Sequence, residues 1–328
     1  MNQIRRRVLR HIGGAAAWAA MLPHASHAAQ DGFPSGPLRF VVPLNPGSGG
    51  DGSTRFIAER MGKLLGQPAI VENRPGGDFI IGVQALLSAP PDGHTLMLLS
   101  ATSMVINPII HKDLPYDPLR DISPLATTAN GTAALVTGTG SRFRTVADVM
   151  NAARKDPRSV SMGYYAQLYR VGGLMMEDMG KVRFSHVPYK GFTQESTDLI
   201  GGALDVAFVD AGAALPSIRS GRLRALGVAS KRRHPDLPEV PTLDERGFPD
   251  LDLLIWVGYG VSAKVPQARA EVLQRALLQV VSQPDFRAYT SQNGSLEVLA
   301  LPGKEVERRI AAETIRYRRL LENAAHAA

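Results

Sequence analysis

The stretch Val41-Val-Pro-Leu-Asn-Pro-Gly-Ser-Gly-Gly-Asp-Gly-Ser-Thr-Arg55 joins two patterns of opposite type. It begins inside the apolar run Leu38–Val42, which predicts a buried strand. After it, apolar residues recur at helical spacing as far as Leu65, which predicts an amphipathic helix. A strand, a glycine-rich loop and a helix start form a cradle for an anion, because glycines let the backbone approach a ligand and the first N–H groups of a helix carry partial positive charge.

Two nucleotide-binding motifs come close to this loop. Gly47-x-Gly49-x-x-Gly52 matches the dinucleotide fingerprint, and Glu72 lies where that motif places an acid for the ribose. The phosphate-binding P-loop is excluded, because Ser53 stands where its phosphate-binding lysine is required. A dinucleotide site therefore stays open, and so does a glycine-rich turn that binds nothing.

The N-terminus predicts an export signal that spans residues 1–28. Four arginines between Arg5 and Arg10 precede the apolar segment Ile12–Leu22, which is too short to cross a bilayer, and Ser26-His27-Ala28 is a plausible cleavage site. The arginine run also resembles a twin-arginine signal, with an ordinary secretory signal as the alternative. Either signal predicts a mature protein that begins at Ala29 and lies in the periplasm.

Composition excludes several classes of protein. The chain has 328 residues and a net charge of +7, and loss of the four signal arginines leaves +7 − 4 = +3, which gives little reason to expect nucleic acid. The chain has no cysteine, so disulfides, thiolate metal sites and cysteine nucleophiles are excluded. The histidines lack metal-ligand spacing and there is no Gly-x-Ser-x-Gly motif, so we expect no cofactor, no metal and no enzyme.

The rest of the chain alternates strand-like and helical patterns, which predicts an α/β fold with a largely parallel sheet. Between Asn130 and Ser141 the composition shifts to Gly, Thr and Ala around a short expected strand, Ala133–Val136, and we place a domain crossover there. A proline-punctuated connector follows Val228. The chain then ends in the strand-like run Leu253–Val261 and two amphipathic helices, which we expect to pack on the first domain.

Several motifs occur together and in a fixed order over essentially the whole mature chain. In this arrangement the sequence resembles the Bug/TctC family, the solute-binding proteins of tripartite tricarboxylate transporters. The blocks that carry the resemblance are Pro46-Gly47-x-Gly49-x-Asp51, Glu72-Asn-Arg-Pro-Gly76, Pro91-Asp-Gly-His-Thr95, Leu114-Pro-Tyr-Asp-Pro118, His186-Val-Pro-Tyr-Lys-Gly191 and Leu237-Pro-Glu-Val-Pro-Thr242.

The resemblance implies a two-lobed periplasmic binding protein of the type II-like, Venus-flytrap kind. Lobe 1 would consist of residues 37–130 and 231–328, lobe 2 of residues 131–230, and the ligand cleft would lie between them. The expected protein is a monomer that is not an enzyme. It would capture a small carboxylate and deliver it to the membrane permease subunits of a tripartite tricarboxylate transporter.

The expected ligand-binding residues come from both lobes. Family members hold a carboxylate largely with backbone N–H groups and hydroxyls, which agrees with the glycine-rich loop and its helix start. Asp51 is expected to organise that helix rather than to touch an anion. The lobe 1 residues in this set are Leu44, Asn45, Ser48, Gly49, Gly50, Phe79 and Thr102.

The sequence departs from the pattern of the family that it resembles at two stretches that are expected to line the ligand. Asp78, Phe79 and Ile80 replace small or amide residues, and a loop expected in lobe 2, Gly163–Arg170, carries three tyrosines and an arginine. Tyrosine offers a flat apolar face and arginine grips a carboxylate with two hydrogen bonds, so an aromatic or bulky carboxylate is indicated. The lobe 2 residues of the expected site are Tyr164, Tyr165, Gln167, Arg170 and Asp210.

Three alternatives stay open at this point. The tyrosines of lobe 2 fill a narrowed cleft instead of contacting a ligand. The protein is an NAD-linked enzyme that uses the Gly47–Gly52 fingerprint. The protein is a ligand sensor that signals to a membrane kinase rather than to a permease.

Overall fold

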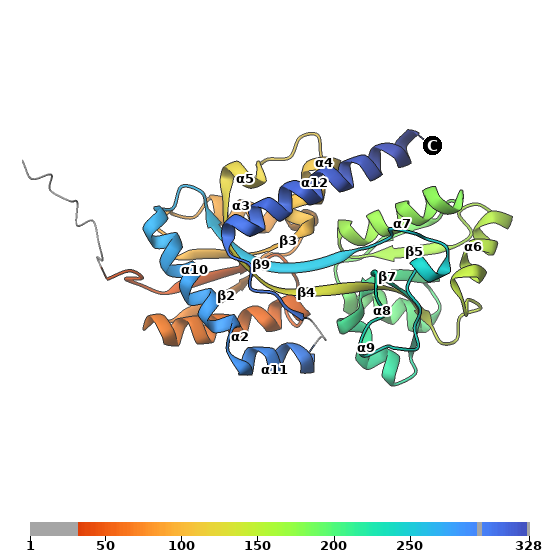
Figure 1. Ribbon diagram of the computed structural model, residues 1–328, viewed down its shortest axis with the longest axis horizontal. Helices are drawn as coiled ribbons and strands as arrows, with labels where there is room; N and C mark the ends of the chain where they lie inside the picture. The colour runs from red at the N-terminus through yellow and green to blue at the C-terminus, as the bar shows by residue number, and fades with distance from the viewer. Residues whose placement is uncertain (1–31, 294–296, 327–328) are drawn as a thin grey trace, which may run out of the picture.

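Two α/β lobes lie side by side along the long axis of the molecule (Figure 1). The computed structural model describes residues 32–293 and 297–326, so the predicted signal, residues 1–28, lies outside the described residues. None of the described helices combines the length and the apolar character that a membrane span requires.

The sheet of the first lobe combines parallel and antiparallel strands. Its order is β2-β1-β3-β9-β4, with β10 paired to β4 outside this path. β1 is parallel to β2 and β3, whereas β9 is antiparallel to both β3 and β4. The strands are β1 (Leu38–Val42), β2 (Ala69–Asn73), β3 (Thr95–Ser100), β4 (Ile122–Gly138), β9 (Leu254–Ser262) and β10 (Glu297–Val298).

Helices cover both faces of this sheet, because successive side chains of a strand point to opposite faces. Leu38, Phe40 and Val42 pack into one core with residues of α2 and α10, whereas Val41 packs into the other core with α3. The helical segments of this lobe are α2 (Gly49–Leu65), η1 (Gly77–Phe79), α3 (Ile80–Leu87), η2 (Thr102–Ile106), α4 (Asn107–Ile110), α5 (Pro118–Asp121), α10 (Gln267–Val281), α11 (Pro284–Asn293) and α12 (Gly303–His326).

The second lobe repeats this layered arrangement. In its sheet β5 is parallel to β6 and β7, and the far end of β4 is antiparallel to β7 and β8. Its strands are β5 (Ser161–Tyr164), β6 (Ser185–Pro188), β7 (Val206–Asp210) and β8 (Leu223–Ala229). Its helices are α6 (Val146–Lys155), α7 (Gln167–Gly180), α8 (Phe192–Gly201) and α9 (Ala211–Arg219), and η3 (Asp244–Arg246) is a short turn in the connector.

One long strand belongs to both sheets. β4 pairs with β9 from Ile122 to Thr132 and then, from Ala133 to Gly138, with β7 and β8. The sequence predicted only a short strand, Ala133–Val136, at a change of domain. The structure corrects this prediction, because the crossover lies inside a continuous 17-residue strand. Its first half was missed because Pro124 and several Ala and Thr residues weaken the apolar signal of a strand.

The connector that precedes β9 packs against the second lobe. Val228 and Thr242 form a bridge between β8 and the connector, and Leu237 and Val240 lie in the same apolar core as Val228. The chain then returns along β9, which pairs with β4 from Leu254. The lobe limits at residues 131 and 231 stay a proposal, and on this packing we propose to move the second limit to residue 253.

The C-terminal helix α12 contacts both lobes, as it packs on η2 and β4 and also on α7 (Figure 1). Arg309 donates to Asn130 of β4 (2.9 Å), and Glu313 accepts from the indole N–H of Trp256 in β9 (2.9 Å). Arg309 and Glu313 also pair with each other at 2.7 Å. The expected packing on the first domain therefore describes only part of the role of α12, since its polar side chains also hold the two crossing strands.

Gly138, the last residue of β4, supplies a stability prediction. A Cβ added there would lie 2.1 Å from the carbonyl oxygen of Leu199 in α8, whereas a Cβ at nearby Gly140 meets nothing within 4 Å. We expect Gly138→Ala to lower the free energy of unfolding by about 1–3 kcal/mol, because the backbone of α8 must move. Gly140→Ala is the matched control and should change it by less than about 0.5 kcal/mol in urea denaturation. Equal effects of both substitutions would contradict this packing.

Candidate functional site

A cleft of about 950 Å³ lies between the two lobes. Its walls are the loops and helix starts that follow the carboxyl ends of β1 and β3 in the first lobe and of β5, β6 and β7 in the second. Ile255, Trp256 and Val257 of the crossing strand β9 also line it. Ligands of open α/β sheets bind at this edge, because the N-termini of the following helices meet there.

The start of α2 offers backbone donors to the cleft. The helix begins at Gly49, so the N–H groups of Gly49 and Gly50 have no acceptor within the helix. Ser48 is the N-cap, and its Oγ accepts from the N–H of Asp51 (3.2 Å). Ser48, Gly49 and Gly50 all line the cleft, which places two free donors and the positive end of a helix dipole on its wall.

Asp51 organises this loop from within. Its carboxylate accepts from the N–H of Gly47 (2.9 Å), from Asn73 Nδ2 (2.9 Å) and from Arg55 Nε (3.1 Å). Burial raises the pKa of Asp51, but the hydrogen bonds from Arg55, Gly47 and Asn73 outweigh burial and leave the pKa below its usual value. Asp51 is therefore an ionised side chain at the third helical position, and its carboxylate bonds to the loop and its neighbours rather than to a ligand.

Two helices of the second lobe also begin at the cleft, and unlike α2 they have no side-chain cap. The N-cap of α7 is Ala166 and that of α8 is Gly191, and neither provides a hydrogen bond from its side chain. Ala166 and Leu168 of α7, and Phe192 and Thr193 of α8, line the cleft. The first N–H groups of these helices thus add donors opposite those of α2.

The third helix of this wall, α9, is capped by Asp210. The Oδ1 of Asp210 accepts from the N–H groups of Gly212 (2.8 Å) and Ala213 (3.1 Å). Burial raises the pKa of Asp210 to about 6, although these two hydrogen bonds act in the opposite direction. Asp210 lines the cleft, and its raised pKa lowers the negative charge that an anionic ligand meets near pH 6.

The cleft carries little fixed positive charge. Among the described residues that line it, Lys190 is the only lysine or arginine, and Asp198 and Asp210 are acidic. Within the described part of the chain, no cluster of three or more His, Asp or Glu side chains is placed to hold a metal ion. The donors that the cleft offers to an anion are therefore mainly backbone amides and hydroxyls, a donor set that avoids the cost of burying an unpaired cation.

Aromatic side chains form much of the remaining wall. The rings of Tyr165 and Tyr169 lie 4.7 Å apart between centroids, and Tyr165 donates from its hydroxyl to that of Tyr169 (3.0 Å). Phe192 lies 6.4 Å from Tyr165. Phe79 faces them from the first lobe, and the buried Trp256 lies between the lobes on β9. The cleft thus combines amide donors for an anion with flat apolar surfaces for the rest of a ligand.

Comparison with known proteins fits this geometry. The family model of the tripartite tricarboxylate transporter family receptor, TctC, matches residues 53–325. The chain belongs to this family. The protein from the tcbD-tcbE intergenic region of Pseudomonas sp. (strain P51) is 34% identical over 307 residues, which cover 90% of this chain and 89% of that protein. Protein BugT of Bordetella pertussis is 28% identical and covers 85% of this chain and 86% of its own length.

Solved structures have the same fold. A periplasmic transporter has a TM-score of 0.82 and 27% identity, and covers 88% of this chain and 97% of its own. The periplasmic binding protein BugD has a TM-score of 0.82 and 24% identity, and covers 89% and 99%. MatC of Rhodopseudomonas palustris, solved with bound malate, has a TM-score of 0.81 and 23% identity, and covers 88% and 99%. The expected family and the two-lobed periplasmic-binding-protein fold are confirmed.

The structure brings most of the expected ligand-binding residues to one place. Nine of them line the cleft, and they are Leu44, Asn45, Ser48, Gly49, Gly50, Phe79, Thr102, Tyr165 and Asp210. Contact with a ligand stays a prediction for each of them.

Tyr164, Gln167 and Arg170 are not among the residues that line the cleft. The expected loop Gly163–Arg170 is short, since β5 ends at Tyr164 and α7 begins at Gln167. Arg170 therefore lies in the first turn of a helix, with its guanidinium carbon 6.0 Å from the centre of the Tyr164 ring. Gln167 forms a hydrogen bond to the other lobe instead. We propose no direct carboxylate contact for these three side chains.

Several residues that line the cleft were missed from sequence. Trp256 lies in β9, and Tyr289 and Thr290 lie in α11, far along the chain from the glycine-rich loop. Ser100, at the end of β3, also lines the cleft, and its buried Oγ lacks a hydrogen-bond partner among the described residues. The position of Ser100 at a strand end was a usable signal, whereas no local pattern connects α11 with this site.

The residues of the dinucleotide alternative are engaged elsewhere. Glu72, the expected ribose acid, forms ion pairs with Arg39 (3.3 Å) and with Arg74. Gly52 lies inside α2, with its N–H bonded to the carbonyl of Ser48 (2.9 Å). The ion pairs of Glu72 therefore count against the dinucleotide alternative, and Asp51 organises the glycine-rich loop from within.

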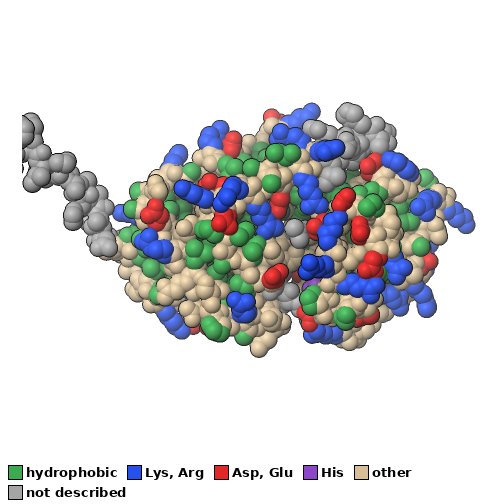
Figure 2. Space-filling model, viewed as in Figure 1, with side chains coloured by type: hydrophobic (Ala, Val, Ile, Leu, Met, Phe, Trp, Pro, Cys, Tyr) green, Lys and Arg blue, Asp and Glu red, His purple; other side chains and the backbone are tan. Residues whose placement is uncertain are grey.

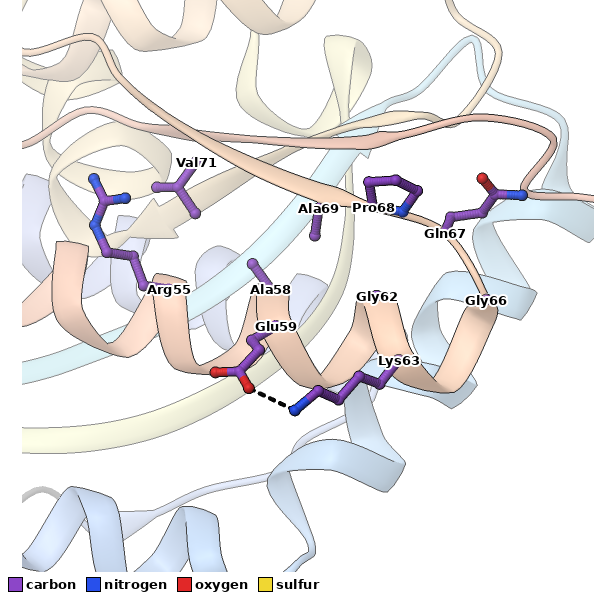
Figure 3. Close-up of a pocket in the computed structure, with 10 residues that line it drawn as sticks. All are labelled: Arg55, Ala58, Glu59, Gly62, Lys63, Gly66, Gln67, Pro68, Ala69 and Val71. Carbon is purple, nitrogen blue, oxygen red and sulfur yellow. Dashed lines mark hydrogen bonds and ion pairs between the residues drawn. The ribbon is translucent and has the colours of Figure 1, made fainter.

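A second depression, of about 680 Å³, lies on the first lobe beside the other end of α2 (Figure 3). Figure 3 shows its residues along α2 and the segment that leads into β2, with Glu59 and Lys63 joined by a 2.6 Å ion pair. The C-terminal end of a helix carries partial negative charge, which disfavours a carboxylate. The cleft between the lobes is therefore the candidate site.

Asp210 supplies a pH-dependent prediction. Its pKa in the folded protein, about 6, lies above the ordinary value of 3.8. The folded state therefore binds this proton more tightly, and the contribution of Asp210 to stability falls as the pH rises from about 4 through 6. Asp210→Asn keeps an oxygen that can cap α9 but cannot ionise.

We expect the free energy of unfolding of Asp210→Asn, measured relative to the unmodified protein, to increase between pH 4 and pH 7 by on the order of 1 kcal/mol. Urea denaturation at several pH values measures this difference. A difference that stays constant with pH would show that Asp210 titrates normally.

Proposed function

We propose that this protein is a periplasmic solute-binding protein that captures a small carboxylate and delivers it to a tripartite tricarboxylate-type membrane permease. The observation that carries the proposal is the set of helix starts that meet across the cleft, α2 on one lobe and the uncapped α7 and α8 on the other. Two such groups of amides suit an anionic group held between lobes that close on it.

We further propose an aromatic or otherwise bulky carboxylate as the ligand. The volume of about 950 Å³ accommodates more than a four-carbon acid, and Phe79, Tyr165, Phe192 and Trp256 offer flat apolar surfaces around it. Two structures with the same fold were solved with dicarboxylates, malate in MatC and adipate in an R. palustris protein. Those ligands support the carboxylate class but not a particular acid.

The remaining parts of the proposal follow from the family and the N-terminus. We propose that residues 1–28 direct export and are removed after Ala28, and that the mature chain acts as a monomer in the periplasm. On the face shown in Figure 2, basic and acidic side chains are intermixed over both lobes. Such a surface suits a soluble carrier that docks on a membrane partner better than it suits a nucleic acid.

A thermal-shift screen of the mature protein against aliphatic and aromatic carboxylates tests the proposal. A carboxylate present at about a hundred times its dissociation constant should add roughly 2.7 kcal/mol to the free energy of unfolding. NAD at the same concentration should produce no shift. Stabilisation by NAD and by no carboxylate would reverse the assignment.

Gly49 allows a single donor to be removed without loss of the helix. It is the first helical residue of α2, a position that proline favours, and Ser48 before it has the extended backbone (φ −71°, ψ 160°) that a following proline requires. We expect Gly49→Pro to weaken binding of the best carboxylate of the screen by about 1.5–3 kcal/mol, because the N–H group is lost.

Gly49→Ala is the matched control, since it keeps the N–H group and its Cβ meets no protein atom within 4 Å. Isothermal titration calorimetry of both variants measures the difference. Equal affinities would mean that the N–H of Gly49 does not bind the carboxylate.

A further inference from the structure

The short segment Gly77–Phe79 of the first lobe has an unusual backbone. Asp78 (φ 51°) and Phe79 (φ 76°) are consecutive residues in the left-handed region of backbone conformation, which residues other than glycine rarely adopt. Strain of this kind persists only where surrounding contacts hold it, and it is concentrated at sites that position a ligand or a switch. Phe79 is the cleft residue that this backbone presents.

Contacts from both lobes hold Asp78 in this conformation. Within the first lobe, Asn107 Nδ2 donates to the carbonyl of Asp78 (2.6 Å), and His111 Nε2 lies 3.7 Å from its Oδ2. From the second lobe, Gln167 Nε2 donates to the same Oδ2 (2.8 Å). Asp78 is therefore fixed to its own lobe by the backbone and to the opposite lobe by the side chain.

The Asp78–Gln167 hydrogen bond joins the two lobes at a point outside their covalent connection. Asp78 lies next to α3, and Gln167 is the first residue of α7, whereas the covalent connection between the lobes runs through β4, β9 and the connector. Among the described residues, a second hydrogen bond joins loops of the two cleft walls, from Asn45 Nδ2 to the carbonyl of Lys190 (3.0 Å). Rotation of one lobe about the crossing strands must stretch such contacts.

We propose that the Asp78–Gln167 hydrogen bond is a closure contact that couples the position of the Phe79 ring to the closed arrangement of the lobes. Asp78 and Gln167 act as positioning residues, and Phe79 acts as a specificity residue that contacts the apolar part of a bound carboxylate. This proposal rests on the proposed function of the cleft. The contact adds free energy to the closed state alone, so it strengthens binding chiefly by slowing dissociation.

Gln167→Leu tests the contact most cleanly. It removes the donor, keeps a buried side chain of similar size and leaves the backbone of Asp78 unchanged, and the freed carboxylate can be solvated because its side chain is 32% exposed. With benzoate and adipate as probes, we expect roughly tenfold weaker binding of benzoate, most of it in the dissociation rate. Calorimetry measures the affinities, and stopped-flow fluorescence of Trp256, the one tryptophan of the sequence outside the expected signal, measures the dissociation rates.

Selectivity separates a positioning role from a merely structural one. Phe79→Leu should weaken the binding of benzoate more than the binding of adipate. Gln167→Leu should change the ratio of the two affinities in the same direction. The double variant should lose no more benzoate affinity than whichever single variant binds benzoate more weakly, because both changes remove one coupled arrangement. Losses that multiply, or an unchanged ratio of affinities, would overturn the proposal.

Two further variants serve as controls. Asp78→Asn keeps an acceptor oxygen and tolerates the left-handed backbone, so it should retain most of the affinity. Asp285→Ala removes a hydrogen bond of similar length, Arg60 Nε to Asp285 (2.7 Å), that joins α2 to α11 within one lobe. It should leave both affinities unchanged, and an equal loss there would show a general effect on stability.

A measurement without ligand makes the test independent of the proposed function. The chain has no cysteine, so spin labels at Leu119→Cys in α5 and Met179→Cys in α7, both exposed positions, report the distance between the lobes. Gln167→Leu should shift this distribution toward open forms, whereas Asp285→Ala should not. If neither benzoate nor adipate binds, the proposed ligand class fails, and an unchanged distance distribution in Gln167→Leu separately overturns the closure contact.

Discussion

The backbone hydrogen bonds of β4 set the arrangement on which the rest of the molecule depends. One half of this strand completes the sheet of the first lobe through β9, and the other half completes the sheet of the second lobe through β7 and β8. Because a single extended strand carries both ladders, the carboxyl edges of the two sheets face each other. The cleft follows from that pairing, and Trp256 of β9 becomes part of its wall.

This arrangement explains how an anion can be bound with little fixed positive charge. Each parallel strand leads into a helix whose first N–H groups lack acceptors. The helices α2, α7 and α8 begin at the cleft, and at α7 and α8 no side-chain cap occupies these N–H groups. Amides lose less free energy on burial than an unpaired lysine or arginine does. The same walls carry aromatic rings, so under the proposed function selectivity would arise at the apolar part of the ligand.

The sequence predicted the first lobe more accurately than the second. The glycine-rich loop was predicted correctly because its strand, its glycines and its helix are contiguous, so local rules suffice. In the second lobe, Tyr164 and Arg170 were expected to face a ligand from a loop, but α7 begins at Gln167 and turns Arg170 beside Tyr164. Boundaries of short elements depend on packing against neighbours, which no local pattern contains. Gln167 was selected as a ligand contact, and its observed partner is Asp78.

The sequence by itself determined the α/β alternation, the family and the amide-rich start of α2, because each depends on residues that are close together in the chain. The tertiary structure alone decided that one strand serves both sheets, that α11 and β9 line the cleft and that α12 holds the crossing strands. It also decided that Glu72 pairs with arginines rather than standing free for a ribose. These features depend on contacts between distant segments, whose geometry is settled only when backbone pairing and side-chain packing are satisfied together.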